Sequence, residues 1–340
     1  MRVPPPVRSG SQIAIVAVSS AIAPAAIEIG CERLRSLFDL EPVVSDTCRR
    51  DGEWLRSHPE ARVQALHDAF SSSSIGAVIA ATGGDDQLTI CEHLDDTLLR
   101  ENPTRFFGIS DNTVLHSYLS SIGLVSYYGG QLVPGLSLDS SLPAYTERSL
   151  RRALFGQTIG SIEPAEKWTD DVAPYGTSRM WESTNGWRWH PGDTPVVEGR
   201  SWGGCLEVIQ WLLAADCCVP ETIDGGVLLL ETSEELPSAT TVERVLRCLG
   251  ERGLLAQFDA ILVGRPKTRH RESRSNEERV TFASEQRQAI LAARDRYAPA
   301  ATVVCELPFG HTDPHVPIPV GGTIRIDTEN REIICVDDRE

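Results

Sequence analysis

The sequence predicts an α/β protein with a parallel sheet covered by helices, followed by a region of mixed or antiparallel strands. Along residues 12–155, short apolar runs rich in β-branched residues alternate with segments of helical spacing. This alternation is typical of βαβ units and of a parallel sheet with helices on both faces. Residues 323–327 and 332–336 have instead the pattern of an antiparallel hairpin.

The composition indicates which classes of molecule the protein binds and where in the cell it is expected. The chain has 340 residues, 41% hydrophobic and 24% charged, which is enough for two ordinary soluble domains. Its formal net charge of −16 would repel nucleic acid and anionic membranes, so a small-molecule or peptide partner is favoured. The nine scattered cysteines suggest reduced thiols, and the apolar run at 13–18 is too short for a signal peptide. We therefore expect a cytoplasmic protein.

The order of elements follows from the same patterns. In the first half we expect strands at 12–19, 42–45, 75–81 and 104–107, with helices at 25–37, 60–70, 87–94, 114–119 and 144–155. In the second half we expect helices at 203–215, 242–249 and 280–294, strands at 226–230, 260–263 and 302–305, and a charged surface stretch at 265–279. The expected domains are 1–160 and 201–340, joined by a Trp-rich loop at 161–200.

Ser110 lies where a buried strand becomes a helix, in Gly108-Ile109-Ser110-Asp111-Asn112-Thr113. A strand-turn-helix is the context that a nucleophilic serine requires. The same residues could also serve only to cap the helix, because a Ser or Asp side chain accepts hydrogen bonds from free backbone N–H groups. Asn112 stands where the common G-x-S-x-G pattern has its second glycine.

Gly83 and Gly84 follow the preceding strand. They could form only a tight turn, but bare backbone amides at the carboxyl end of a parallel strand also lie beside the ligand crevice of an open α/β sheet. Together with Ser110 at the next strand end, they would supply a nucleophile and an oxyanion hole for acyl transfer.

An acid and a base follow later strands. Glu231 ends strand 226–230, and His311 comes shortly after strand 302–305. A serine hydrolase needs an imidazole to accept the hydroxyl proton and a carboxylate to orient it. His311 and His315 could suggest a metal, but Pro314 prevents a helix that would place both on one face, so no metal is expected.

Segments 108–113, 228–233 and 309–321 resemble the serine peptidase family of LD-carboxypeptidases (muramoyltetrapeptide carboxypeptidases) and microcin C self-immunity peptidases. The resemblance covers nearly the whole chain. It implies a flavodoxin-like (class I glutamine amidotransferase-like) N-terminal domain and a smaller C-terminal α/β domain, usually in a homodimer. No cofactor is expected.

The resemblance also implies roles for individual residues. Ser110 would be the nucleophile, Glu231 the orienting acid and His311 the general base. The backbone amides of Gly84 and Asp111 would form the oxyanion hole. The chain departs from the family at Cys205, where many relatives have asparagine, and at Asp85-Asp86. Those two carboxylates would repel an anionic substrate end unless a cation neutralises them, and the candidate cations are Arg105, Arg179 and Arg265.

The resemblance further implies that the substrate is an amide of one of two kinds. The Trp-rich segment favours an aminoacyl or peptidyl nucleotide, because an indole stacks on a base; the expected substrate contacts are Trp181, then Trp168, with Gly83 and Asn112. Burial of the loop would explain the same tryptophans. A murein tetrapeptide that loses its terminal D-Ala is the alternative. Two other hypotheses are a non-catalytic peptide- or nucleotide-binding protein and a metal-dependent amidase.

Overall fold

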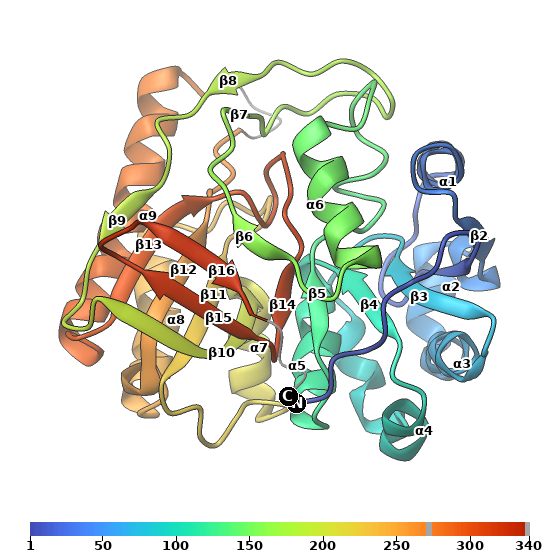
Figure 1. The fold of residues 1–340 in the computed structure, drawn as a ribbon, viewed down its shortest axis with the longest axis horizontal. Coiled ribbons are helices and arrows are strands. Elements are labelled where there is room, and N and C mark those ends of the chain that lie inside the picture. Colours follow the sequence, from blue (N-terminus) through green and yellow to red (C-terminus); the bar gives the residue numbers. More distant parts are fainter. Residues whose placement is uncertain (270–273, 337–340) are drawn as a thin grey trace.

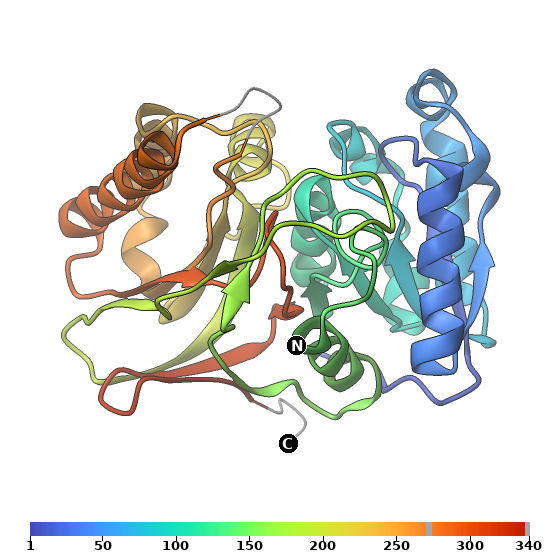
Figure 2. The same ribbon diagram turned by 90° about the horizontal axis from the view of Figure 1, so that it is seen from above.

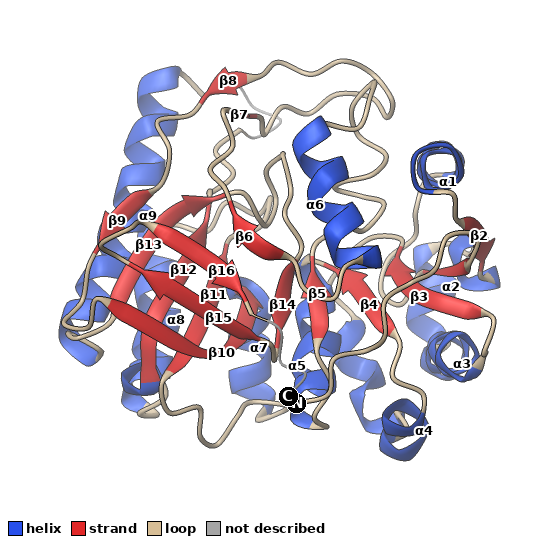
Figure 3. Ribbon diagram, viewed as in Figure 1, coloured by secondary structure: helices blue, strands red, loops and turns tan. Residues whose placement is uncertain are grey.

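The fold consists of two sheets that lie side by side, each flanked by helices (Figure 1). The structure is a computed structural model that describes residues 1–269 and 274–336. Figure 3 shows how strands and helices alternate in space, and the α/β class expected from the sequence is confirmed.

The first sheet has six strands in the order β14-β5-β4-β3-β1-β2. Strands β2, β1, β3, β4 and β5 are parallel, an order compatible with a flavodoxin-like domain. The C-terminal half adds β14, which pairs antiparallel with β5. The bounds are β1 (Gln12–Val16), β2 (Glu41–Val44), β3 (Ile75–Ala80), β4 (Arg105–Gly108), β5 (Ser126–Tyr128) and β14 (Ile318–Val320).

Helices connect these strands, and several begin at residues that stabilise a helix N-terminus. Asp51 and Asp95 accept hydrogen bonds from the first turns of α2 and α4, and Pro24 and Pro59 occupy the first turns of α1 and α3. The helices are α1 (Pro24–Phe38), α2 (Gly52–Ser57), α3 (Pro59–Ser71), α4 (Asp96–Glu101), α5 (Thr113–Ser121) and α6 (Ala144–Phe155), with 3₁₀ turns η1 (Asp46–Arg49), η2 (Gln87–His93) and η3 (Ser110–Asn112).

The second sheet has eight strands in the order β6-β16-β15-β10-β11-β12-β13-β9. Strands β10 to β13 are parallel and the outer pairs are antiparallel, so the expected mixed sheet is found. The hairpin expected at the end of the chain is also found, as β15 and β16. The bounds are β6 (Gly160–Ile162), β9 (Arg188–His190), β10 (Val196–Cys205), β11 (Gly226–Glu231), β12 (Phe258–Gly264), β13 (Thr302–Leu307), β15 (Thr323–Asp327) and β16 (Glu332–Cys335).

The helices of this half are α7 (Leu206–Ala215), α8 (Ala239–Glu251) and α9 (Asn276–Tyr297), with the turn η4 (Leu255–Gln257). Figure 2 shows α9 lying along one side of the second sheet. Helix α9 begins with a capping box, in which Ser275 and Glu278 satisfy each other's backbone N–H groups.

Several stretches differ from expectation. No element was expected where α2, α4, β5 and β14 form, and the helix expected at 87–94 is the 3₁₀ helix η2. Helix α7 begins at Leu206, not at 203, because Gly203 and Gly204 have φ of 119° and 147°, outside the helical range, and continue β10. Segment 161–200, expected as a loop, contains β9 and the short pair β7 (Lys167–Trp168) and β8 (Glu182–Ser183). Stretch 265–279, expected at the surface, buries Arg279; residues 270–273 of it lie outside the described residues.

Both sheets have apolar residues on each face, as parallel strands between helices require. Phe106 and Phe107 on β4 are fully buried on opposite faces, in two different apolar clusters. None of the described helices combines the length and the apolar character needed to cross a membrane. The carboxyl ends of β3 and β4 lead into Gly83, Gly84 and Ser110, while Glu231 ends β11 and His311 follows β13.

Candidate active site

Ser110 occupies a strained turn between β4 and α5. Its φ is 64°, in the left-handed region that non-glycine residues rarely adopt and that costs about 1–3 kcal/mol. A residue held in this conformation at a strand-to-helix turn has the geometry of a nucleophile elbow, which exposes the hydroxyl above the sheet. Ser110 also lines a cavity.

The loop after β3 packs directly against this turn. A Cβ atom on Gly83 would lie only 2.6 Å from the Cβ of Ser110, so a larger residue at position 83 would displace the serine. The carboxylate of Asp111 is turned away from the cavity and accepts hydrogen bonds from the backbone N–H groups of Asp86 and Gln87, at 3.0 and 2.8 Å. It therefore fixes the glycine loop beside the serine.

Tyr128, the last residue of β5, connects the two sheets. Its hydroxyl accepts a hydrogen bond from the backbone N–H of Ser110 at 2.9 Å and donates one to Oε1 of Glu231 at 2.5 Å. Burial and the Glu231 charge raise the pKa of Tyr128 well above its usual value, so the phenol keeps the proton that it donates. The elbow of the first sheet and the acid of the second are thus held by one side chain.

Glu231 and His311 lie in contact, although 80 positions separate them in the chain. His311 Nδ1 is 2.8 Å from Oε2 of Glu231, and both side chains are almost completely buried. The approach depends on Gly310, which has φ of 96° and where a Cβ atom would lie 2.5 Å from Glu231 Oε2. This arrangement fixes the orientation of the imidazole and turns Nε2 to the side opposite Glu231.

Glu234 occupies the other side of the imidazole. Its Oε2 is 3.1 Å from His311 Nε2, and no hydrogen bond joins Ser110 to His311 within the described part of the chain. Burial lowers the pKa of His311, but the two carboxylates outweigh it and raise that pKa to about 10. The Glu234 side chain is 67% exposed, so it can leave Nε2 without disturbing the core.

Ser110 and His311 line the same cavity, which has a volume of about 690 Å³. Cationic and anionic side chains of the connecting segment and of the loop after β12 complete its wall, and Tyr175 adds an aromatic ring that is 37% exposed. The cavity is also lined by Gly83, Gly84, Arg179, Glu234, Lys267 and Arg269.

Three of the expected substrate contacts lie elsewhere. Asn112 is fully buried, and its amide bonds to Thr82 O, Ile109 O and Gln131 beneath the elbow. Trp181 donates its Nε1–H to Asp139 at 2.9 Å. Gly83 is the one of the four expected contacts that lines the cavity in the described structure.

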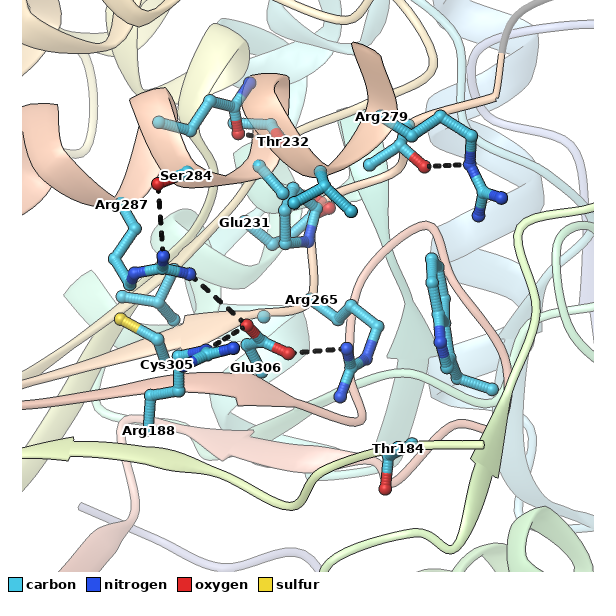
Figure 4. Close-up of a pocket in the computed structure, with 18 of the residues that line it drawn as sticks. Thr184, Arg188, Glu231, Thr232, Arg265, Arg279, Ser284, Arg287, Cys305 and Glu306 are labelled. Atoms are coloured by element: carbon cyan, nitrogen blue, oxygen red, sulfur yellow. Dashed lines mark hydrogen bonds and ion pairs between the residues drawn. The ribbon is translucent and has the colours of Figure 1, made fainter. Parts of the chain in front are cut away.

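Trp168 lies on a second cavity, of about 290 Å³, at the carboxyl ends of β11 to β13 (Figure 4). There the guanidiniums of Arg188, Arg265 and Arg287 converge on the carboxylate of Glu306, at 2.8, 2.6 and 3.4 Å. The Trp168 ring stacks against Arg265, 4.9 Å from its centroid. This tryptophan belongs to an arginine cluster.

Two of the residues that depart from the family pattern, Asp86 and Cys205, have partners in the structure. Asp86 pairs at 3.0 Å with the buried Arg62, a cation that the sequence gave no reason to choose. Of the three candidate cations, only Arg179 lines the active-site cavity, and it pairs with Asp313 at 2.7 Å. Cys205 is buried, and its backbone N–H donates to the Thr113 hydroxyl at 3.0 Å.

Sequence reasoning missed Tyr128, Tyr175 and Glu234. Tyr128 could have been suspected, since a tyrosine in a buried strand needs a partner for its hydroxyl. Glu234 is one of several acids that follow β11, and nothing in its spacing indicates that it returns to the histidine.

Comparison with known proteins gives matches over both halves. Residues 13–129 match the LD-carboxypeptidase N-terminal domain, and residues 198–326 match the LD-carboxypeptidase C-terminal domain. The chain is 23% identical over 277 residues to the Escherichia coli microcin C7 self-immunity protein MccF, covering 80% of this chain and 77% of that protein. It is 25% identical over 263 residues to the probable murein peptide carboxypeptidase of Bacillus subtilis, covering 76% and 73%.

Among solved structures, the chain is similar to an MccF-like protein from Streptococcus pneumoniae in complex with AMP. The two are 27% identical, with a TM-score of 0.84, and the superposition covers 97% of this chain and 99% of that one.

We predict that Tyr128→Phe lowers kcat about 10- to 100-fold with little change in KM. The substitution removes a hydrogen bond to a charged group, worth about 1.5–3 kcal/mol, and loosens the acid and the elbow without touching substrate. Steady-state kinetics test this, with Tyr118→Phe on α5 as the control. Equal kcat for the Tyr128→Phe and wild-type proteins would show that the tyrosine has no positioning role.

We predict that Glu234→Gln shifts the acidic limb of the kcat/KM profile to lower pH by about 1–3 units, the effect expected on removing one neighbouring opposite charge. The carboxylate raises the pKa of His311, so without it the imidazole loses its proton at lower pH. The adjacent, exposed Glu235 provides the control variant Glu235→Gln. An unmoved limb in Glu234→Gln would contradict the role assigned to this contact.

Proposed function

The chain belongs to the LD-carboxypeptidase family of serine peptidases, and from that premise we propose that it hydrolyses amides through an acyl-enzyme on Ser110. The observation that carries the proposal is the strained Ser110 turn facing a cavity that it shares with the Glu231-bound His311. A strained hydroxyl, an oriented imidazole and a cavity between them are the parts that nucleophilic catalysis needs.

In the proposed mechanism, His311 Nε2 takes the proton of Ser110 as its Oγ attacks the amide carbonyl. Glu231 stabilises the imidazolium through the Nδ1–H hydrogen bond. The backbone N–H groups of Gly84 and Asp111 donate to the oxyanion, since both residues flank the Ser110 turn. His311 then protonates the leaving amine, and water releases the acyl group by the same steps.

Glu234 has to leave Nε2 before this sequence starts. With a carboxylate on each nitrogen, His311 is held as an imidazolium, which cannot accept a proton. A substrate that carries an ammonium group would attract Glu234, and an aminoacyl group has one. Movement of one exposed side chain therefore converts the resting arrangement into a base.

We propose an aminoacyl or peptidyl nucleotide as the substrate, so that hydrolysis would protect against antibiotics of this type. Two observations support it. The Streptococcus pneumoniae relative was solved in complex with AMP, at 27% identity over nearly the whole chain. The cavity beside Ser110 combines Tyr175, able to stack on a base, with the cations Lys267, Arg179 and Arg269, which suit an anionic linkage.

Removal of terminal D-Ala from a murein tetrapeptide is the second candidate. Its support is the similarity to the Bacillus subtilis protein and the position of Lys267, which could bind a terminal carboxylate in the same cavity. The stacking ring is superfluous for this substrate. For that reason we rank the murein tetrapeptide second among the candidate substrates.

We predict that Ser110→Ala lowers kcat by more than about 10³-fold while it still binds substrate, because the hydroxyl is consumed in the reaction and not in recognition. Wild type and variant are each given an aminoacyl sulfamoyl adenosine and the murein tetrapeptide. Turnover is followed by mass spectrometry and binding by calorimetry. Wild-type turnover of the tetrapeptide alone would reverse our choice of substrate, and full activity of the variant would remove the nucleophile.

We predict that Tyr175→Ala raises KM for the aminoacyl nucleotide about 10- to 100-fold, since stacking on one base is worth about 1–3 kcal/mol. Tyr175→Phe keeps the ring and should behave as wild type, and Trp181→Phe, away from the cavity, serves as a further control. The tetrapeptide KM should not change. A Tyr175→Ala variant with an unaltered nucleotide KM would show that the ring makes no stacking contact.

A further inference from the structure

Three cysteine thiols meet at the boundary between the two sheets, away from the residues that line the active-site cavity. They are Cys91 in η2, and Cys217 and Cys218, which follow α7. Their sulfur atoms all lie within 4.8 Å of one another, and the sulfurs of the adjacent pair are 3.5 Å apart. All three are free thiols.

The backbone after α7 is shaped to bring the adjacent thiols together. Neighbouring residues of an extended chain point to opposite sides. Here Asp216 and Cys218 both have positive φ, 50° and 54°, so the chain reverses around Cys217 and both sulfurs face Cys91. Two non-glycine residues in this region cost about 1–3 kcal/mol each, a strain that tends to accompany function.

The separations suit a shared cation better than a disulfide. Thiolate sulfurs lie about 2.3 Å from Zn²⁺, which places sulfurs of one site about 3.8–4.0 Å apart. The observed sulfurs need to move by less than about 1 Å to reach that spacing, whereas a disulfide would bring two sulfurs to about 2.05 Å and leave the third unused.

The surroundings favour a soft ion. Cys91 and Cys217 border an apolar cluster with Val114 from the first sheet's half and Leu212 from the second. The Ser121 hydroxyl and the Asp96 carboxylate lie near Cys218, so the three thiols are the soft ligands of a site that also has oxygen atoms at its edge. Cys218 also lines an open cavity of about 660 Å³, which gives an ion a path from solvent and room for a water ligand.

We propose that Cys91, Cys217 and Cys218 bind a thiophilic d¹⁰ cation, with Zn²⁺ as the preferred ion. Thiolates select Zn²⁺ and Cu⁺ among the common biological metals. Three thiolates with Zn²⁺ leave one net negative charge and with Cu⁺ leave two, and the apolar setting favours the smaller charge. The ion would join η2 to the end of α7 and fasten together the two halves that share the active site.

The test uses the full-length reduced protein, stripped with a chelator and then dialysed against Zn²⁺. We expect one zinc per chain by elemental analysis and, with Co²⁺ as probe, a thiolate-to-cobalt charge-transfer band. A parallel titration with Cu⁺ against a copper chelator compares the two ions. Serine variants of each of the three cysteines should weaken Zn²⁺ binding about 100-fold or more, beyond the loss seen when only an outer partner of a metal ligand is removed.

Two controls make the assignment specific. Cys248→Ser changes an exposed thiol on α8 and should leave binding unaltered. Glu234→Gln removes a carboxylate beside His311. If this variant binds Zn²⁺ as the wild type does, the ion is not held by Glu234 in the active site. Zinc should also protect the three cysteines of the wild-type protein from alkylation while Cys248 reacts, a readout that does not depend on whether the variants fold.

Three results would overturn the proposal. They are a wild-type protein that retains no ion, Zn²⁺ binding that survives the serine substitutions, and alkylation of the three cysteines that zinc does not slow.

Discussion

The hydrogen bond from Tyr128 to Glu231 is the contact on which the rest of the site depends. Serine lies on the first sheet, and the acid and base lie on or beside the second, so neither half holds a complete site. Tyr128 fixes the distance between them because its hydroxyl bonds to both the Ser110 backbone and the Glu231 carboxylate. A buried carboxylate is costly without partners, and Glu231 has two, the phenol and the imidazole. The pairing of β14 with β5 adds a second, backbone-mediated connection between the halves.

Close packing around this contact explains residues that have no chemistry of their own. Gly83 allows the loop after β3 to touch Ser110, and Gly310 allows the His311 loop to touch Glu231. Thr113 accepts from Cys205 N–H and donates to Ser110 O, so it also spans the two halves. The geometry of the candidate site is therefore set by small residues and backbone contacts, while one exposed carboxylate, Glu234, occupies Nε2 of His311.

Much of this could be predicted from sequence because it depends on local pattern. The β-branched runs and helical spacings located β1, β2, β3 and β4 of the first sheet but not β5 or β14, and strand ends pointed to Ser110, Glu231 and His311. What the sequence pattern could not show depends on contacts distant in sequence. Trp168 and Trp181 look like ligand-stacking residues, yet each has a guanidinium against its ring. No pattern shows that Arg62 neutralises Asp86, or that Glu234 returns to the histidine. The helix was predicted to begin at Gly203 because the apolar spacing that follows is helical, whereas Gly203 and Gly204 belong to β10.

In the proposed mechanism, Ser110 becomes acylated within a site assembled from both sheets. The most direct measurement is rapid acid quenching of the wild-type protein during turnover of an aminoacyl sulfamoyl adenosine, followed by peptide mapping. The account predicts an aminoacyl adduct on the peptide that contains Ser110, formed and lost at rates consistent with kcat. Turnover at full rate with the adduct on another residue would contradict it.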